Sequence, residues 1–82
     1  MIEVLFFARF RETLGTDRIA LEADGLTTLA DVLAAVKHKL GEKAEVLEQG
    51  TVLAAVNQEM SPLTAAVKAG DEVAFFPPVT GG

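Results

Sequence analysis

The sequence has 82 residues, 50% of them hydrophobic, and a formal net charge of −5 at pH 7, which corresponds to one small acidic domain. Cysteine is absent and histidine occurs once, which excludes disulfides, thiolate metal sites, a cysteine nucleophile and a multi-histidine metal site within one chain. The acidic balance disfavours a nucleic acid partner, because phosphate backbones are bound by basic surfaces.

The beginning of the chain predicts a strand. Residues 2–9 are rich in β-branched and aromatic side chains and are apolar on both faces. They lack the basic segment of a signal peptide, and no apolar run approaches the roughly 20 residues of a membrane span. We therefore expect a cytoplasmic protein with no membrane partner.

A second strand follows after a turn. Gly15 and Asp17 are turn residues, and residues 18–23 alternate with the more apolar side chains on one face. This pattern predicts a hairpin between the first two strands, with the turn over residues 10–17.

Residues 28–40 predict the main helix. An apolar stripe recurs there at helical spacing, formed by Leu29, Val32, Leu33, Val36 and Leu40. Thr28 and Asp31 have the spacing of a capping box, and Gly41 is suited to the C-terminal end. Residues 42–50 predict a weaker helical turn closed by Gly50.

The remaining elements complete a mixed sheet. Residues 51–57 and 72–79 predict strands, with a further short strand at Glu59 and Met60, and Pro77 and Pro78 end the last one. The order strand–strand–helix–strand–strand–strand predicts an α+β fold of the β-grasp, or ubiquitin-like, type, with one main helix across one sheet face. We expect a folded domain over residues 1–76 and an extended tail over residues 77–82.

Candidate catalytic residues have simpler explanations. His38 lies opposite the apolar stripe and is expected to be solvated, and Asp31 is explained by the helix start. Ser61 has no histidine partner in a known motif. The sequence therefore predicts no catalytic residue and no metal site.

One face of the sheet is expected to be exposed and apolar. Alternation places one set of side chains under the helix (Ile2, Val4, Phe6, Val73 and Phe75) and leaves another set outward (Leu5, Phe7 and Phe76). Exposed aromatic residues suggest a protein-binding surface. Two alternatives remain: the turn at residues 42–47 or another loop covers these side chains, or a register shift exchanges the two faces.

The last residues suggest a carrier. Glycine has no Cβ and can enter a narrow channel, and the two prolines keep the preceding segment extended. The tip is an α-carboxylate, which becomes an acyl donor after adenylation. Because the chain has no cysteine, any sulfur that it carries must be held at Gly82 as a thiocarboxylate. The alternative is a tail without function.

Three stretches resemble a known family: VLFFAR near the start, LAAVNQ in the middle and GDEVAFFPPVTGG at the end. At these separations the chain is similar throughout to the small, sulfur-carrier subunit of molybdopterin synthase. The resemblance implies a β-grasp fold and a heterotetramer of two small and two large subunits. It implies a hydrophobic contact surface at Phe7, Arg11, Met60 and Phe76, with the catalytic groups on the large subunit and no cofactor bound to this chain.

The resemblance also implies the chemistry of the tail. An E1-like activating enzyme uses ATP to adenylate Gly82, which a sulfur-transfer system converts to a thiocarboxylate. The loaded tail enters the large subunit and donates sulfur to cyclic pyranopterin monophosphate in molybdenum cofactor biosynthesis. The residues inserted in the partner would be Pro77, Pro78, Val79, Thr80 and Gly81.

Other functions remain open at this stage. A thiamine-pathway sulfur carrier shares the fold and the Gly–Gly end. A ubiquitin-like modifier would be conjugated to lysines through Gly82. A plain β-grasp interaction domain would tolerate the loss of Gly81 and Gly82.

Overall fold

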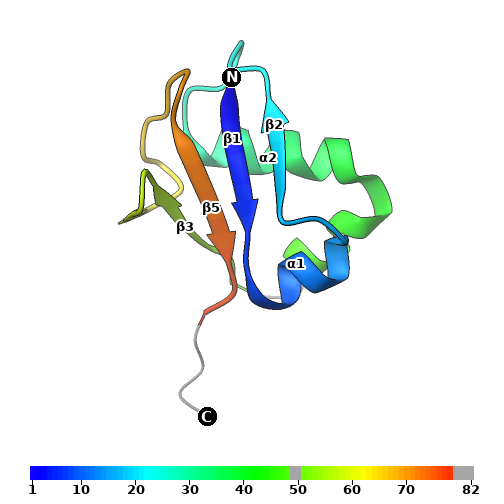
Figure 1. Cartoon of the computed structure of the whole chain (residues 1–82). Coiled ribbons are helices and arrows are strands. Elements are labelled where there is room, and N and C mark those ends of the chain that lie inside the picture. Colours follow the sequence, from blue (N-terminus) through cyan, green and yellow to red (C-terminus); the bar gives the residue numbers. More distant parts are fainter. Residues whose placement is uncertain (49–50, 79–82) are drawn as a thin grey trace.

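The computed structural model describes residues 1–48 and 51–78. Figure 1 shows a twisted sheet with a long helix behind it. The elements in chain order are β1 (Ile2–Phe6), α1 (Ala8–Leu14), β2 (Arg18–Leu21), α2 (Leu29–Leu40), the 3₁₀ helix η1 (Gly41–Glu48), β3 (Leu53–Val56), β4 (Glu59–Ser61) and β5 (Glu72–Phe76).

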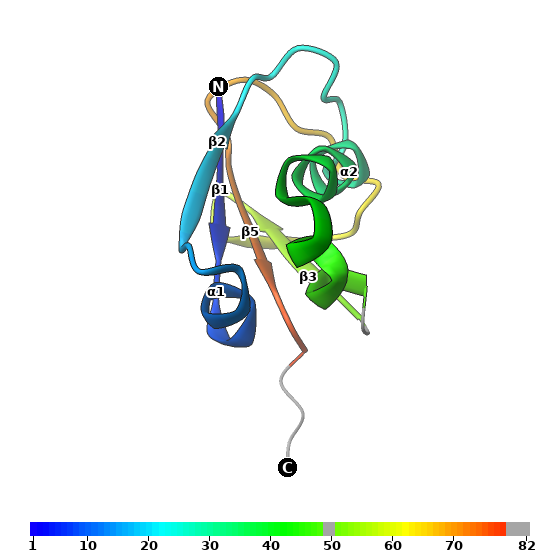
Figure 2. The ribbon, with the colours of Figure 1, turned by 90° about the vertical axis from the view of Figure 1, so that its right-hand side faces the viewer.

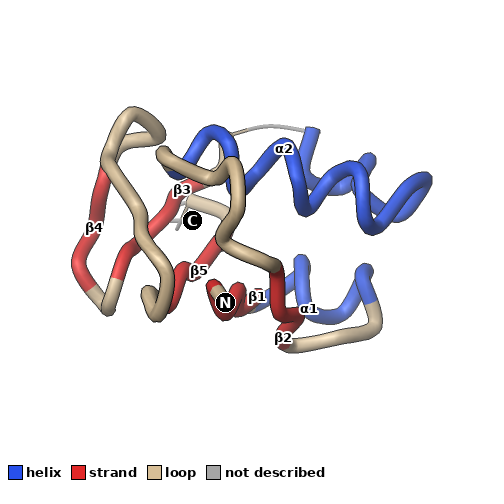
Figure 3. Tube along the Cα trace, turned by 90° about the horizontal axis from the view of Figure 1, so that it is seen from above, coloured by secondary structure: helices blue, strands red, loops and turns tan. Residues whose placement is uncertain are grey.

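The five strands form one mixed sheet in the order β2-β1-β5-β3-β4. The first and last strands, β1 and β5, pair in parallel at the centre, and the remaining neighbours pair antiparallel. With α2 across one face, this is the predicted β-grasp fold. Figure 3 shows α2 and the strands as two layers.

The predicted turn between the first two strands is wrong, because helix α1 occupies most of it. Phe10 and Leu14 lie four residues apart on one face of α1 and are both buried, which explains why this short segment is helical. Gly15 ends the helix in the left-handed conformation, and its N–H donates to the Arg11 carbonyl over 3.0 Å. Strands β1 and β2 do pair, with Ile2 opposite Leu21.

Helix α2 begins with the predicted capping box. The Asp31 N–H donates to the Thr28 hydroxyl oxygen, and the Thr28 N–H donates to the Asp31 carboxylate. The next N–H groups, of Leu29 and Ala30, donate to carbonyls of the β4–β5 connection. The N–H groups at the start of α2 are therefore satisfied within the protein and tie the helix to the β4–β5 connection.

The other predicted elements are present with shorter bounds. Strand β3 covers four residues of the predicted 51–57, β5 ends at Phe76, and the short β4 is present. The weaker helical turn is η1, and Gly50, expected to close it, lies outside the described residues. In residues 1–48 and 51–78, no helix has the length and apolar character to cross a membrane.

The core lies between the inner face of the sheet and the helices. Figure 2 shows α2 beside the sheet and α1 near the end to which β1 and β5 run. The inner-face prediction is confirmed, because all five of its side chains are at most 1% exposed: Ile2, Val4, Phe6, Val73 and Phe75. Burial of such side chains stabilises a fold by about 1.5–3 kcal/mol each relative to exposure.

Candidate functional site

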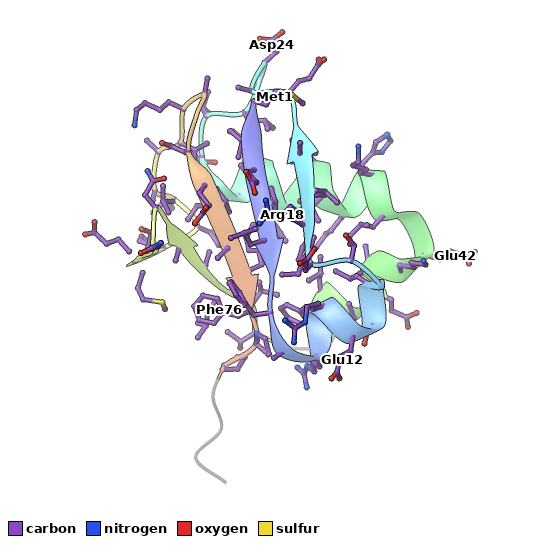
Figure 4. All side chains as sticks on the ribbon, viewed as in Figure 1. Met1, Glu12, Arg18, Asp24, Glu42 and Phe76 are labelled. Carbon is purple, nitrogen blue, oxygen red and sulfur yellow. The ribbon has the colours of Figure 1, made fainter. Side chains whose placement is uncertain are left out.

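The outer face of the sheet, opposite α2, carries a groove. Eight residues line it: Leu5, Phe7, Ala55, Gln58, Met60, Glu72, Ala74 and Phe76. They come from four strands, the β1–α1 junction and the β3–β4 turn. The outer face is turned toward the viewer in Figure 4, where Phe76 lies at the end of β5.

Strand register explains why these side chains meet. Ala74 of β5 is paired with Leu5 on one side and Ala55 on the other, and Ala55 is paired with Met60. Paired residues project from the same face of a sheet, so the four side chains form one row across it. The two small alanines in the middle leave the depression that becomes the groove.

Two large apolar side chains stand at opposite sides of the groove. Phe7 is 45% exposed and Met60 is 59% exposed, whereas Leu5 and Phe76 are half-buried. Exposed aromatic and methionine side chains around a recess are typical of protein–protein interfaces. The groove is therefore suited to receive apolar side chains of a partner.

The backbone beside both exposed residues is strained. Among the described residues, three that are not glycine have a positive φ: Ala8 at 54°, Asn57 at 50° and Gln58 at 71°. Ala8 directly follows Phe7, and Gln58 itself lines the groove two residues before Met60. Left-handed backbone at residues other than glycine costs roughly 1–2 kcal/mol and concentrates at functional sites. The strain here lies at both edges of the groove.

A hydrogen-bonded network holds the β3–β4 turn against the start of β5. The side chain of Asn57 donates to the Asp71 carboxylate over 3.1 Å and accepts from the Glu72 N–H over 3.0 Å. The Asn57 N–H donates to the Glu72 carbonyl over 2.7 Å. Asp71, only 5% exposed, also accepts from the Lys68 N–H over 2.8 Å. The turn that carries Gln58 is therefore fixed in place.

The network also changes the protonation of Asp71. The backbone N–H of Lys68, then the Asn57 amide, stabilise the carboxylate and hold the pKa of Asp71 below its ordinary value of 3.8. The Lys68 ammonium, 3.2 Å away, acts in the same direction. Asp71 is therefore ionised at neutral pH and acts as a fixed acceptor.

The structure brings together three of the four predicted contact residues. Phe7, Met60 and Phe76 line one groove, whereas Arg11 is exposed on α1 and does not line it. Both alternatives for the outward side chains are wrong. The turn at residues 42–47 packs into the core through Ala44, Val46 and Leu47, and the register places the two faces as predicted.

Four lining residues were missed from the sequence as members of this site: Ala55, Gln58, Glu72 and Ala74. Alternation along the last strand puts Glu72 and Ala74 on the same face as Phe76, and this signal could have found both of them. The contribution of Ala55 and Gln58 depends on the pairing of β3 with β5, for which a single sequence gives no signal.

The tail is described only at its beginning. Pro77 and Pro78 are half-buried and follow β5 directly. Val79, Thr80, Gly81 and Gly82 lie outside the described residues, so the division into a domain of residues 1–76 and a tail of residues 77–82 stays a prediction. The groove runs along β5 from Glu72 to Phe76, so one of its ends directly precedes Pro77.

The three candidate catalytic side chains are either exposed to solvent or hydrogen-bonded to nearby residues. His38 is exposed on α2, and Asp31 accepts hydrogen bonds from Thr27 and Thr28, which lower the pKa of Asp31. The Ser61 hydroxyl donates to the Glu59 carbonyl over 3.0 Å. His38 and Asp31 both lie on α2, seven residues apart, and Ser61 lies on β4. The hydrogen bonds of Asp31 and Ser61 are local and do not join these side chains into a common site.

Fold and groove together define a β-grasp protein with an open, largely apolar sheet face that runs along the last strand toward the tail. Comparison with known proteins makes the class specific. The chain belongs to the ThiS family, whose model matches residues 4–82.

Individual relatives are similar over their whole length. The chain is 50% identical to the molybdopterin synthase sulfur carrier subunit of Haemophilus influenzae and 48% identical to that of Escherichia coli, with 100% of each chain covered in both alignments. Among solved structures, small archaeal modifier protein 1 (SAMP1) of Haloferax volcanii superposes with a TM-score of 0.81 at 32% identity, covering 99% of this chain and 98% of that one.

Proposed function

We propose that the chain is the sulfur carrier subunit of a molybdopterin synthase. The observation that carries the proposal is the similarity to two such subunits over their full length, which includes the terminal glycines. The groove supports it, because a carrier must be held by the protein that receives its tail. In this proposal the chain donates sulfur and the catalytic groups belong to the large subunit.

The proposed chemistry takes place at the carboxylate of Gly82. An E1-like enzyme uses ATP to form an acyl adenylate and releases pyrophosphate. Sulfur at the oxidation level of hydrosulfide, delivered by the sulfur-transfer system, then attacks the acyl carbon and displaces AMP, which leaves a thiocarboxylate. Adenylation is required because a free carboxylate is a poor acyl donor. The thiocarboxylate then supplies its sulfur to cyclic pyranopterin monophosphate within the large subunit.

The groove and the tail have separate roles in this proposal. Phe7, Met60 and Phe76 contact the large subunit, and Arg11 on α1 contributes from beside the groove. Pro77 and Pro78 direct residues 79–82 into the partner, where the glycines fit a narrow channel. The assembly would contain two small and two large subunits.

The experiment that tests the carrier role is the intact mass of the protein after incubation with ATP, an E1-like activating enzyme and a sulfur source. We expect a shift that corresponds to replacement of one oxygen by sulfur, and its loss when Gly82 is deleted. The deletion variant should keep the wild-type melting temperature, because Gly82 lies beyond β5. No shift with an enzyme active on a control carrier would contradict the proposal.

A second candidate function is conjugation to lysines of other proteins through Gly82. The observation that favours it is the superposition on a small archaeal modifier protein over nearly the whole chain. Adducts that resist reductant and disappear on deletion of Gly82 would support this role. A cell extract that shows the thiocarboxylate but no such adducts would contradict it.

A further inference from the structure

Glu72 is the one charged side chain among the eight residues that line the groove. It is half-buried at the first position of β5, and its neighbours in the lining include Ala74 and Phe76 on the same face of the strand. A carboxylate beside apolar surface loses part of its hydration, which has a cost unless a cation or a hydrogen-bond donor replaces the lost water. The position therefore needs a partner group.

Glu3 occupies the position on β1 that is equivalent to Glu72 on β5. Glu3 and Glu72 are Cα partners in the parallel register of β1 and β5, so both project from the outer face. The Glu3 carboxylate pairs with the Arg18 guanidinium over 2.6 Å. Within residues 1–48 and 51–78, no basic side chain forms an ion pair with Glu72. Of these two adjacent carboxylates, that of Glu3 is neutralised by Arg18, whereas that of Glu72 has no cation beside it among the described residues and lies in the groove lining.

Hydrogen bonds with Asn57 hold both the N–H and the carbonyl group of Glu72. Its N–H donates to the Asn57 side chain over 3.0 Å, and its carbonyl accepts from the Asn57 N–H over 2.7 Å. The carboxylate therefore projects from a fixed point and has little backbone entropy to lose on binding. Adjacent carboxylates on one sheet face also repel each other, and the ion pair of Glu3 with Arg18 only partly offsets this repulsion.

We propose that the large subunit places a lysine or arginine side chain against Glu72 while its apolar side chains fill the neighbouring groove. The inference rests on the proposed function and adds a charge requirement to the docking surface. Charge complementarity favours such a partner, because the Glu72 carboxylate lies in the lining of the groove beside Glu3, which already has its cation. Glu72 then selects a partner surface that is apolar with a basic group at one end.

The experiment measures the affinity of the purified large subunit for the full-length chain carrying Glu72→Gln, which removes the charge and keeps the shape. Glu59→Gln is the matched control, because Glu59 is exposed on β4 and does not line the groove. We expect about a tenfold loss of affinity for Glu72→Gln and less than about a twofold loss for Glu59→Gln. At about 1 M salt, where the Debye length is about 3 Å, the difference in affinity between the wild type and Glu72→Gln should become smaller.

Stability provides an independent readout. Glu72→Gln removes repulsion with Glu3, so its melting temperature should equal or exceed that of the wild type while its affinity falls. If the glutamine variant does not fold, Glu72→Thr replaces it, since a β-branched residue suits a strand. Equal affinity of the Glu72 variant and wild type would overturn the inference, as would equal losses for Glu72→Gln and Glu59→Gln. A wild-type chain that does not bind the large subunit would overturn the proposed function itself.

Discussion

The two faces of the sheet come from the same strands and have opposite properties. The inner face is closed by α2 and η1, and its five strand residues are at most 1% exposed. The outer face has no helix over the groove, and its apolar side chains other than the small Ala55 are half-buried or exposed. The difference shows that alternation along β1 and β5 supplies two apolar surfaces, of which the chain itself covers one.

Phe75 and Phe76 give the largest expected contrast, because they are adjacent in β5 and project from opposite faces. Phe75→Ala should lower the free energy of unfolding by about 3–5 kcal/mol. Phe76→Ala should lower it by less than about 1.5 kcal/mol and weaken binding of the large subunit by about 2 kcal/mol or more. Denaturant unfolding and calorimetric titration measure the two quantities. Equal destabilisation by both variants would mean that the outer face is also part of the core.

Asp71→Asn is expected to have an intermediate effect, confined to the network behind the groove. Because the folded-state pKa of Asp71 lies below the ordinary 3.8, the folded state binds fewer protons than the unfolded one in this range. The stabilisation is complete above the unfolded-state pKa and is lost as the pH falls through the folded-state pKa.

The asparagine variant should therefore be less stable than the wild type at neutral pH and should lose less stability on acidification. Unfolding free energies between neutral pH and about pH 2 test this sign. Asp24→Asn, an exposed aspartate outside the network, is the control. If the unfolding free energies of the wild type and Asp71→Asn change in parallel with pH, the Asp71 carboxylate does not help to hold the β3–β4 turn.

Ala8→Gly should have the smallest effect and the opposite sign. Glycine accepts the φ of 54° without strain, so we expect the free energy of unfolding to rise by up to about 1 kcal/mol. The same change at Ala34, an exposed position inside α2, should lower it by about 0.5–1 kcal/mol. If the strain also orients Phe7, the Ala8 variant binds the large subunit less tightly while unfolding less readily. A loss of stability at both positions would show that Ala8 is not strained.

Much of this arrangement follows from the sequence, and the exceptions have identifiable causes. The capping box at Thr28 and Asp31 and the alternation around Phe75 are local patterns, so they predicted α2 and the inner face. Helix α1 was missed because Phe7, at its N-cap, makes no capping hydrogen bond through its side chain, and the helix begins at a residue with left-handed φ. The groove required knowledge of which strands are neighbours, and the pairing of β5 with β3 is a property of the whole fold.

The parallel pairing of β1 with β5 has a consequence for biosynthesis. Strand β1 is synthesised first, but it can pair with β5 only after β5, the last strand, has been made. Contacts between residues so far apart in the sequence slow folding. Until β5 inserts, β1 and β3 each present an open edge, which favours aggregation or degradation. A chain released before β5 is made therefore lacks the strand that joins β2-β1 to β3-β4. Only a chain whose synthesis has reached β5, the strand that precedes the tail, can form the complete five-stranded sheet.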